Sequence, residues 1–322
     1  MLKDIINNIT DMFGGNISAV IKDEDRAVFR VQDQTGEGIM IYHAVFPGAY
    51  LSYNDFHMQG CDSKFRTNVD MFCIDHCREG RIEQDMGNGA YSYLEAGDLK
   101  IDKRKKHDTH FVFPLCHYHG ITVTLYVEEA AKTLATDLTG FSIDLYALQR
   151  KFCAERNLNM IRGQGTIEHI FSELYTVPNR IRKPYFKLKV LELLLFLDTL
   201  EIPADQGDRP YFYKSQVEKI KALQAYMTAD VQNHYTLEEL STRFDIPLTA
   251  MKICFKGVYG TSIFAYMRVY RMNQAAVLLR SDREKNIAEI AGQVGYDSPS
   301  KFSIAFKEVM GKSPLEYRKS FV

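Results

Sequence analysis

The sequence predicts a multidomain α+β protein, with a β-rich N-terminal part, then helices, then an all-α C-terminal domain with two helix-turn-helix units. Two observations predict this order. Short apolar stretches rich in β-branched and aromatic residues dominate before residue 128, and apolar residues recur at helical spacing after it. A third observation is that two stretches near the C-terminus repeat each other, which predicts that one helical unit occurs twice.

The first 128 residues contain short apolar stretches separated by Gly, Asp and Asn residues typical of hairpin turns. Many short strands at regular spacing favour a sandwich or a small barrel. We therefore expect a β-rich domain over residues 1–128. Its clearest strand candidates are residues 38–46, 71–77, 90–94 and 121–127.

Residues 129–200 have helical periodicity, for example in the stripe of Leu145, Leu148 and Phe152. The last of these helices, residues 184–200, is apolar nearly all round, so more than one of its faces must be covered. Two interpretations remain open: burial inside its own domain, or a self-association surface between two subunits. Prolines, a glycine and aspartates in residues 201–214 then indicate a linker before a final domain over residues 215–322.

Charge is unevenly distributed along the 322 residues, although the formal net charge is only −1. Residues 216–322 hold 15 Lys and Arg against 11 Asp and Glu, a balance of +4. The remainder holds 25 against 30, a balance of −5. The total excludes a protein that coats nucleic acid along its whole length, whereas a basic C-terminal part fits a module that faces phosphates.

The six cysteines form no C-x-x-C pair, and a chain of this size does not need disulfides, so we expect reduced thiols. The N-terminus has no recognisable signal sequence. The most apolar run, residues 188–200, is too short to span a bilayer and contains three charged residues. These features predict a cytoplasmic protein without a membrane partner.

The C-terminal repeat has an offset of 50 positions in its first part, where Leu240 matches Ile290, and of 51 positions after the extra residue Asp297. Phe255 and Gly260 recur as Phe306 and Gly311, 51 positions later. The same offset relates Lys256 to Lys307, Ser262 to Ser313 and Tyr266 to Tyr317. Capping boxes that begin at Ser215, Thr236 and Asn286 mark helix starts.

These residues resemble the AraC/XylS family of transcription regulators over residues 217–318. The resemblance implies two helix-turn-helix units joined by a long helix, each placing one helix in the major groove of double-stranded DNA. It also implies RNA polymerase as a partner if the protein is an activator. The residues that carry it are Arg271-Met272, Ala275-Ala276, Leu279, Ile287-Ala288-Glu289-Ile290-Ala291, Val294-Gly295-Tyr296, Phe302, Phe306-Lys307, Gly311, Ser313-Pro314 and Tyr317-Arg318.

The length of the joining helix agrees with this expectation. Residues 262–280 are 19 residues, or about 28 Å of helix at 1.5 Å per residue. The major groove recurs about every 34 Å, so two helices held at the ends of this rod can reach adjacent turns on one side of the duplex.

Helical periodicity predicts which side chains face DNA. Leu248, Met251 and Phe255 share the inward face of the first recognition helix, as Phe302, Ala305, Phe306 and Val309 do in the second. The opposite faces supply candidates for base edges and for phosphates. The base-facing candidates are Thr249, Lys252, Ile253, Ser300, Ser303 and Ile304, and the phosphate candidates are Lys256 and Lys307.

Two positions depart from the family, whose members commonly hold arginine where this chain has Ile253 and Ile304. We hypothesise that each isoleucine packs on thymine methyl groups and gives a preference for A·T pairs at those steps. The alternatives are weak binding by one or both units, or a rotation of the helices. Pro247 also replaces the usual serine cap of the first recognition helix.

The β-rich domain resembles the cupin-like sensing domain of many AraC/XylS relatives, and residues 95–99 resemble a turn common there. No effector-binding residue is carried over from this resemblance. The motifs Cys73-x-x-His76-Cys77 and Cys116-His117-x-His119 hold metal-ligand residue types, but the histidine pattern of metal-binding cupins is absent, so we expect no metal and no cofactor. The basic run at residues 103–106 fits a solvated loop better than a DNA or anion contact.

The sequence therefore predicts a cytoplasmic, non-enzymatic, sequence-specific DNA-binding transcription regulator that forms a homodimer. An unidentified small-molecule effector in the N-terminal domain would change the spacing of the two DNA-binding modules of the dimer. One alternative is a metal-dependent cupin enzyme fused to a DNA-binding module. Another is a structural interaction protein, which would not need lysines at matching outward positions in both repeats.

Overall fold

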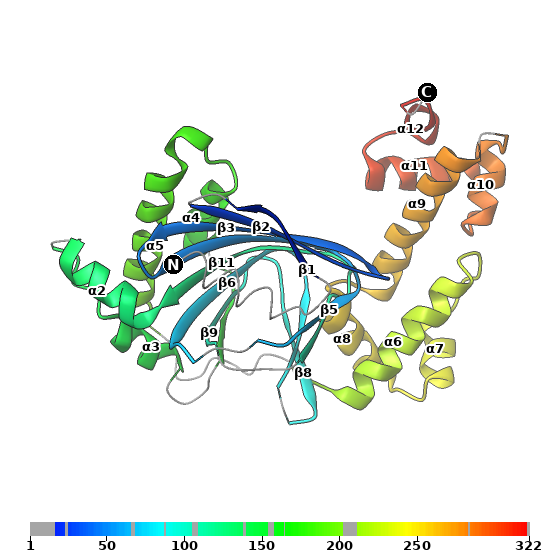
Figure 1. The fold of residues 1–322 in the computed structure, drawn as a ribbon. Coiled ribbons are helices and arrows are strands. Elements are labelled where there is room, and N and C mark those ends of the chain that lie inside the picture. Colours follow the sequence, from blue (N-terminus) through cyan, green and yellow to red (C-terminus); the bar gives the residue numbers. More distant parts are fainter. Residues whose placement is uncertain are drawn as a thin grey trace. The chain divides into compact units, whose positions relative to one another are not determined.

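A computed structural model describes residues 17–22, 25–65, 68–86, 88–104, 109–137, 140–153, 158–163, 165–201, 211–282 and 284–320 (Figure 1). The chain forms two compact parts. The N-terminal region comprises residues 1–84 and 92–209, and the C-terminal region comprises residues 85–91 and 210–322. Most of the expected linker, residues 202–210, lies outside the described residues.

The larger sheet of the N-terminal region has eight antiparallel strands in the order β1-β2-β3-β4-β11-β6-β9-β12. At its centre Val123 of β11 pairs with Leu51 of β4 on one side and with Ile74 of β6 on the other. The strands are β1 (Ile17–Lys22), β2 (Arg26–Asp33), β3 (Gly36–Phe46), β4 (Ala49–His57), β6 (Met71–Gly80), β9 (Leu99–Lys103), β11 (Tyr118–Tyr126) and β12 (Leu158–Ile161).

A second sheet has the order β13-β8-β7-β10-β5. Its strands are β5 (Gly60–Ser63), β7 (Ile82–Asp85), β8 (Ala90–Leu94), β10 (Thr109–Val112) and β13 (Phe212–Tyr213). The prediction of a β-rich domain is therefore confirmed, whereas the cupin-like closed barrel is not. Within the described residues both sheets are open: the larger ends at β1 and β12, and the smaller at β13 and β5.

Four helices pack on one face of the larger sheet (Figure 1). They are α2 (Val127–Asp137), α3 (Leu145–Cys153), α4 (Gly165–Leu174) and α5 (Arg182–Thr199), and a 3-10 turn (Asn179–Ile181) precedes α5. Successive strand residues point to opposite faces, so Leu51, Ile74 and Val123 meet these helices in one apolar core. The alternate residues of the same strands face the other way and line a cavity.

Helix α5 has two kinds of apolar surface. Phe186, Val190, Leu193, Leu194 and Leu197 are buried in the core of the N-terminal region. Ile181, just before the helix, and Leu188 and Leu195 within it remain exposed, with exposed fractions of 41%, 65% and 49%. Burial within its own region therefore accounts for one face of α5 only.

The C-terminal region contains seven helices among its described residues: α6 (Lys214–Ala229), α7 (Leu237–Arg243), α8 (Leu248–Tyr259), α9 (Ile263–Ser281), α10 (Ile287–Gln293), α11 (Pro299–Met310) and α12 (Pro314–Lys319). Helices α7 and α8 form the first helix-turn-helix unit, α10 and α11 form the second, and α9 joins them (Figure 1). None of the helices in the described part of the chain is long and apolar enough to cross a membrane.

Two of the three expected capping boxes are formed. The Thr236 side chain accepts from the backbone N–H of Glu239, and Asn286 accepts from that of Glu289. The box expected at Ser215 is absent, because α6 begins two residues earlier, with Tyr213 as its N-cap and no side-chain cap. Tyr213 belongs to β13, so strand pairing with β8 determines where α6 begins.

Candidate DNA-binding surface

The two recognition helices, α8 and α11, are equivalent in length and termination. Each has 12 residues and ends at a glycine in the left-handed conformation, Gly260 at φ 77° and Gly311 at φ 74°. They differ at the start, because Ser298 caps α11 by accepting from the Lys301 backbone N–H, whereas Pro247 provides no side-chain cap to α8. The left-handed conformation favours glycine, so the repeat of Gly260 and Gly311 reflects a geometric requirement.

The inward faces of both helices are buried as periodicity predicted. Met251 and Phe255 of α8 are fully buried, and so are Phe302 and Phe306 of α11. Leu248 and Val309 are only half-buried. The core of the second unit joins α9, α10 and α11 through Met272, Ala275, Ala276, Leu279, Ile290, Ala291, Val294, Phe302, Ala305 and Phe306.

Seven of the eight candidate contact residues are exposed: Thr249, Lys252, Ile253, Lys256, Ser300, Ile304 and Lys307. The two isoleucines expose 56% (Ile253) and 62% (Ile304) of their surface. Ile253 and Ile304 occupy equivalent positions of the repeat. The two recognition helices therefore resemble each other on their outward faces as well as on their inward faces.

Ser303 is the exception among the candidates. It is half-buried, and its hydroxyl donates a 2.8 Å hydrogen bond to the Pro299 carbonyl one helical turn earlier. The same surface contains an exposed residue that was not among the candidates, Lys301, three positions before Ile304 and therefore on its face. The helical spacing alone was sufficient to identify it.

The turns of the two helix-turn-helix units share a backbone feature. Asp245 has φ 45° and Gly295 has φ 82°, and the two residues are related by the 50-residue offset of this part of the repeat. An L-residue is strained at positive φ, and aspartate tolerates it better than most. Lys219 of α6 holds Asp245 in place through its carboxylate at 3.0 Å and also donates to its carbonyl.

A polar bridge connects the two units. Arg271, in the middle of α9, donates from Nε to the Val231 carbonyl at 3.0 Å and from Nη2 to the Asn233 carbonyl at 2.8 Å. These carbonyls lie in the turn before α7. His234 of the same turn contacts the Gly295 carbonyl at 2.6 Å through Nε2. The bridge therefore runs from the entrance of the first unit, through α9, to the turn of the second.

Close backbone packing reinforces this bridge at Gly295. A Cβ atom at Gly295 would lie 2.8 Å from the Gln232 carbonyl oxygen, which is too close for any other residue. An ion pair between Arg268 of α9 and Glu308 of α11 adds a second connection along the joining helix. These contacts join the turn before α7, the helix α9 and the second helix-turn-helix unit to one another.

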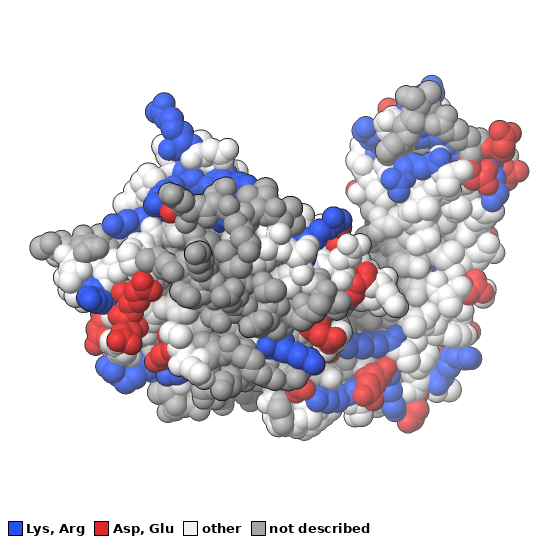
Figure 2. All heavy atoms as spheres, viewed as in Figure 1, with Lys and Arg blue, Asp and Glu red and all other residues white. Residues whose placement is uncertain are grey.

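Basic side chains are present at both recognition helices. Lys252 and Lys256 lie on α8, and Lys301 and Lys307 lie on α11. In Figure 2, Lys and Arg side chains gather at the end of the C-terminal region formed by α11 and α12. Lysines flanking an apolar outward residue on two equivalent helices form a surface suited to phosphates on either side of a base contact.

Comparison with known proteins identifies the domain that carries this surface. Residues 240–320 match the family described as "Helix-turn-helix domain". The chain is 36% identical over 93 residues to the HTH-type transcriptional regulator YisR of Bacillus subtilis, covering 28% of this chain and 32% of that protein. It is 32% identical over 94 residues to a protein of Streptomyces antibioticus described as an AraC-like transcription regulator, covering 29% and 31%.

Residues 240–320 form an AraC-type helix-turn-helix domain. Among solved structures, the C-terminal domain of AraT, a response regulator from Geobacillus stearothermophilus, is 33% identical with a TM-score of 0.31. The match covers 32% of this chain and 84% of that one. The chain spans about a third of the length of the curated relatives named above.

The candidate residues of the N-terminal region are not brought together into a site. His76 points away from Cys73 and stacks on Phe171, with ring centroids 4.2 Å apart. Within the described ranges, no three or more His, Cys, Asp and Glu side chains form a group that could hold a metal ion. Of the basic run at residues 103–106, only Lys103 and Arg104 lie among the described residues, and both form ion pairs.

Proposed function

We propose that the protein is a transcription regulator that binds double-stranded DNA and reads two adjacent major-groove segments with α8 and α11. The observation that carries this proposal is the pair of equivalent outward faces on helices of equal length. The 19-residue helix α9 that joins the two units is about 28 Å long, close to the groove repeat of about 34 Å. Matches to transcription regulators over the same residues support it.

The roles of the side chains follow from their chemistry. Lys256 and Lys307 would contact phosphates, fixing the position of each helix without reading sequence. The base-facing candidates Thr249, Lys252, Ile253, Ser300 and Ile304 would read the groove, the isoleucines through thymine methyl groups. Ser303 is the weakest member of this set, because the Pro299 carbonyl already takes its hydroxyl hydrogen.

The experiment that tests DNA binding uses the full chain and promoter DNA from its own genome, across a range of salt concentrations. Removing one lysine that binds a phosphate should weaken binding to all sequences and reduce the salt slope by about 1. We expect this for Lys256→Ala and for Lys307→Ala. Lys132→Ala, an exposed lysine of α2 in the N-terminal region, is the matched control and should change nothing. Unchanged salt slopes in both recognition-helix variants would contradict the proposal.

Self-association is the second part of the proposal. Leu188 and Leu195 lie seven residues apart and therefore on one side of α5, and the exposed Ile181 lies seven residues before Leu188, in the turn that precedes the helix. An exposed apolar stripe at this spacing is the geometry by which two helices pack together. We propose that α5 pairs with its equivalent in a second copy, so that a homodimer presents two DNA-binding modules.

The third part is regulation by a small-molecule effector in the N-terminal region. An effector shifts occupancy only if it binds two conformations of the dimer with different affinities. The alternative of a metal-dependent cupin enzyme has no support among the described residues, which contain no candidate metal group. Equal DNA affinity with and without a ligand bound in the N-terminal region would contradict effector control.

A further inference from the structure

A cavity lies within the N-terminal region, between the larger sheet and strands β5, β7 and β10 of the smaller one. Its volume is about 130 Å³, taken as the space open to the centres of water-sized molecules. Small-molecule pockets are mostly apolar with a few placed polar groups, and the lining of this cavity has that character. Eight of its nineteen lining residues are aromatic, and the larger sheet supplies five of them, Tyr42, Tyr50, Phe56, Tyr118 and Tyr126.

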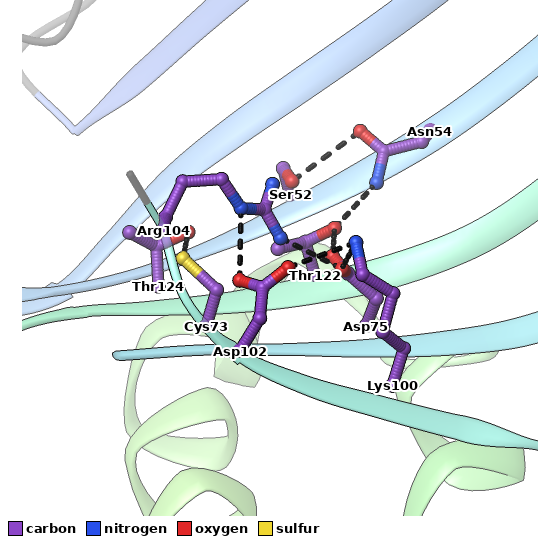
Figure 3. A network of polar contacts seen from close by, with 9 residues as sticks. All are labelled: Ser52, Asn54, Cys73, Asp75, Lys100, Asp102, Arg104, Thr122 and Thr124. Atoms are coloured by element: carbon purple, nitrogen blue, oxygen red, sulfur yellow. Dashed lines mark hydrogen bonds and ion pairs between the residues drawn. The ribbon is translucent and has the colours of Figure 1, made fainter. Parts of the chain in front are cut away.

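The polar groups of the cavity gather at one part of the wall and form a charged network (Figure 3). Arg104 donates from Nη2 to Asp75 at 2.7 Å and from Nε to Asp102 at 3.0 Å. Lys100 contacts the same two carboxylates, at 3.2 Å (Asp75) and 2.9 Å (Asp102). All four side chains come from β6, β9 and the residue that follows β9, and none exposes more than 18% of its side chain.

Neutral side chains extend this network across the sheet. Thr122 of β11 donates to Asp75 at 2.7 Å, and Asn54 of β4 donates from Nδ2 to Thr122 at 2.9 Å. Ser52 donates to Asn54 at 3.3 Å. These bonds fix the orientation of each polar group at the wall, so the cavity presents preformed hydrogen-bonding positions beside its aromatic surface (Figure 3).

The charged network carries no net charge, but it has a hydrogen-bond donor available to a bound molecule. Asp75 and Asp102 balance Lys100 and Arg104, so the four ionised groups sum to zero. Burial alone would raise the pKa of Asp75. The charges of Arg104 and Lys100 outweigh this effect and lower the pKa to about 2, which keeps the carboxylate ionised. Nη1 of Arg104 has no hydrogen-bond partner among the described residues and can donate to a bound molecule.

The charge balance selects the class of ligand. A full charge on a molecule in this cavity would lose its hydration and find no uncompensated partner, which is unfavourable in a low-dielectric site. A neutral oxygen that accepts a hydrogen bond carries no such cost. The aromatic wall meanwhile favours a ring or an alkyl chain over a sugar-like molecule with polar groups on every side.

We propose that this cavity binds a neutral, mainly apolar small molecule whose hydroxyl or carbonyl oxygen accepts a hydrogen bond from Arg104. The molecule's ring or chain lies against the aromatic wall. This inference rests on the proposed function in one respect only, that the ligand is the regulator's effector. Binding itself does not require DNA, so the two can be tested apart.

The test measures binding of four naphthalene probes of similar size to the full chain by titration calorimetry without DNA. The probes are 2-naphthol, naphthalene, 2-naphthoate and 2-naphthylmethylammonium. We expect 2-naphthol to bind at least tenfold more tightly than each of the other three. If no probe binds below millimolar concentration, or a charged probe binds as tightly as 2-naphthol, the proposal is overturned.

Two variants locate the binding site. Cys61→Phe on β5 fills the cavity and should abolish binding of 2-naphthol, whereas Cys153→Leu on α3, outside the cavity, should leave it unchanged. Arg104→Lys keeps the charge but removes Nη1, and should reduce the preference for 2-naphthol over naphthalene to less than threefold. Thermal unfolding confirms that each variant is folded, and an undiminished preference in Arg104→Lys contradicts the assigned role.

DNA retardation by the same preparation, without probe, separates the two proposals. A protein that binds promoter DNA but no probe contradicts the cavity proposal alone. A protein that binds 2-naphthol but no DNA contradicts the proposed function alone. If both bind, DNA titrations with and without saturating 2-naphthol should differ in affinity by at least threefold, and equal affinities would contradict the role of the cavity ligand as effector.

Discussion

Arg271 donates a hydrogen bond from Nη1 to Nδ1 of His234 across 3.2 Å. A guanidinium can only donate, so Nδ1 is the acceptor and the imidazole proton is on Nε2. That proton is therefore directed at the Gly295 carbonyl, 2.6 Å away. One arginine in the joining helix thus determines the tautomer of the histidine that connects the first helix-turn-helix unit to the turn of the second.

We expect Arg271→Met to lower the free energy of unfolding of the C-terminal region by about 2–3 kcal/mol. The carbonyls of Val231 and Asn233 would lose their donors, and His234 would lose the partner that orients it. His234→Ala should cost about 1 kcal/mol, because His234 is exposed. Denaturant unfolding measures both, with exposed His169→Ala of α4 as control. Equal stability of Arg271→Met and the native protein would contradict this role.

Ile304→Arg should change the sequence that α11 selects. If Ile304 packs on a thymine methyl, arginine in its place would favour guanine, and one good bidentate contact is worth about 1–3 kcal/mol, or roughly 5–150-fold. Selection of binding sites from random DNA measures the change. Ile253→Arg should alter only the other half of the site. The same selected sequence for both variants and the native protein would rule out base contact by either isoleucine.

Leu188→Glu and Leu195→Glu should convert a dimer into a monomer, because each places a charge in the apolar stripe of α5. Sedimentation velocity of the full chain measures the mass. Tyr146→Glu on α3 is the matched control, since Tyr146 is an exposed large side chain elsewhere in the N-terminal region. A dimer that survives both leucine substitutions would exclude α5 as the interface.

The N-terminal region should lose stability in mild acid because of His76. Burial, with a smaller contribution from the nearby charge of Arg78, lowers the pKa of His76 to about 4 from 6.5. The unfolded chain therefore binds a proton as pH falls below 6.5 while the folded chain resists it down to about pH 4. Stability present above pH 6.5 is lost as pH falls through this window, by about 2 kcal/mol from this group between pH 7 and pH 5.

The matched variant for this prediction is His76→Phe, which keeps a ring against Phe171 but cannot titrate. Its free energy of unfolding should fall by about 2 kcal/mol less than that of the native protein over the same pH interval. The free energy of unfolding of this variant should still decrease somewhat because of His43. Burial lowers the pKa of His43 to about 4, with smaller contributions from the charges of Arg182 and Arg26. Identical pH dependence of the two proteins would show that His76 is not responsible.

Local sequence signals predicted the C-terminal domain well. The positions of Met251, Phe255, Phe302 and Phe306 follow helical periodicity, and the caps at Thr236 and Asn286 need only residues within one turn. Exposure of seven of the eight candidates follows from the same periodicity, and so does that of the omitted Lys301. The hydroxyl of Ser303 was misjudged because a serine inside a helix can bond to the preceding turn instead of facing outward.

Features that depend on distant pairing were not predictable in this way. The order of strands in the larger sheet brings β12 beside β9, and no periodicity within Leu158–Ile161 indicates that partner. The cupin-like barrel, which depends on pairing of this kind, is not confirmed among the described residues. The charged network in the cavity likewise joins Asp75, Lys100 and Thr122 across three strands, and residues so far apart in sequence carry no common motif.

The C-terminal region is discontinuous in sequence, because residues 85–91 belong to it. Phe212 pairs with Tyr91 in the β13–β8 ladder, and its ring lies where a Cβ atom of Gly257 in α8 would be, 2.2 Å away. A fragment that begins at residue 211 would thus keep β13 without its partner strand β8. The unpaired strand and the exposed ring of Phe212 beside α8 would favour aggregation. A minimal DNA-binding fragment should therefore include residues 85–91. Without them, a loss of DNA binding would reflect the missing strand and not the affinity of the recognition helices for DNA.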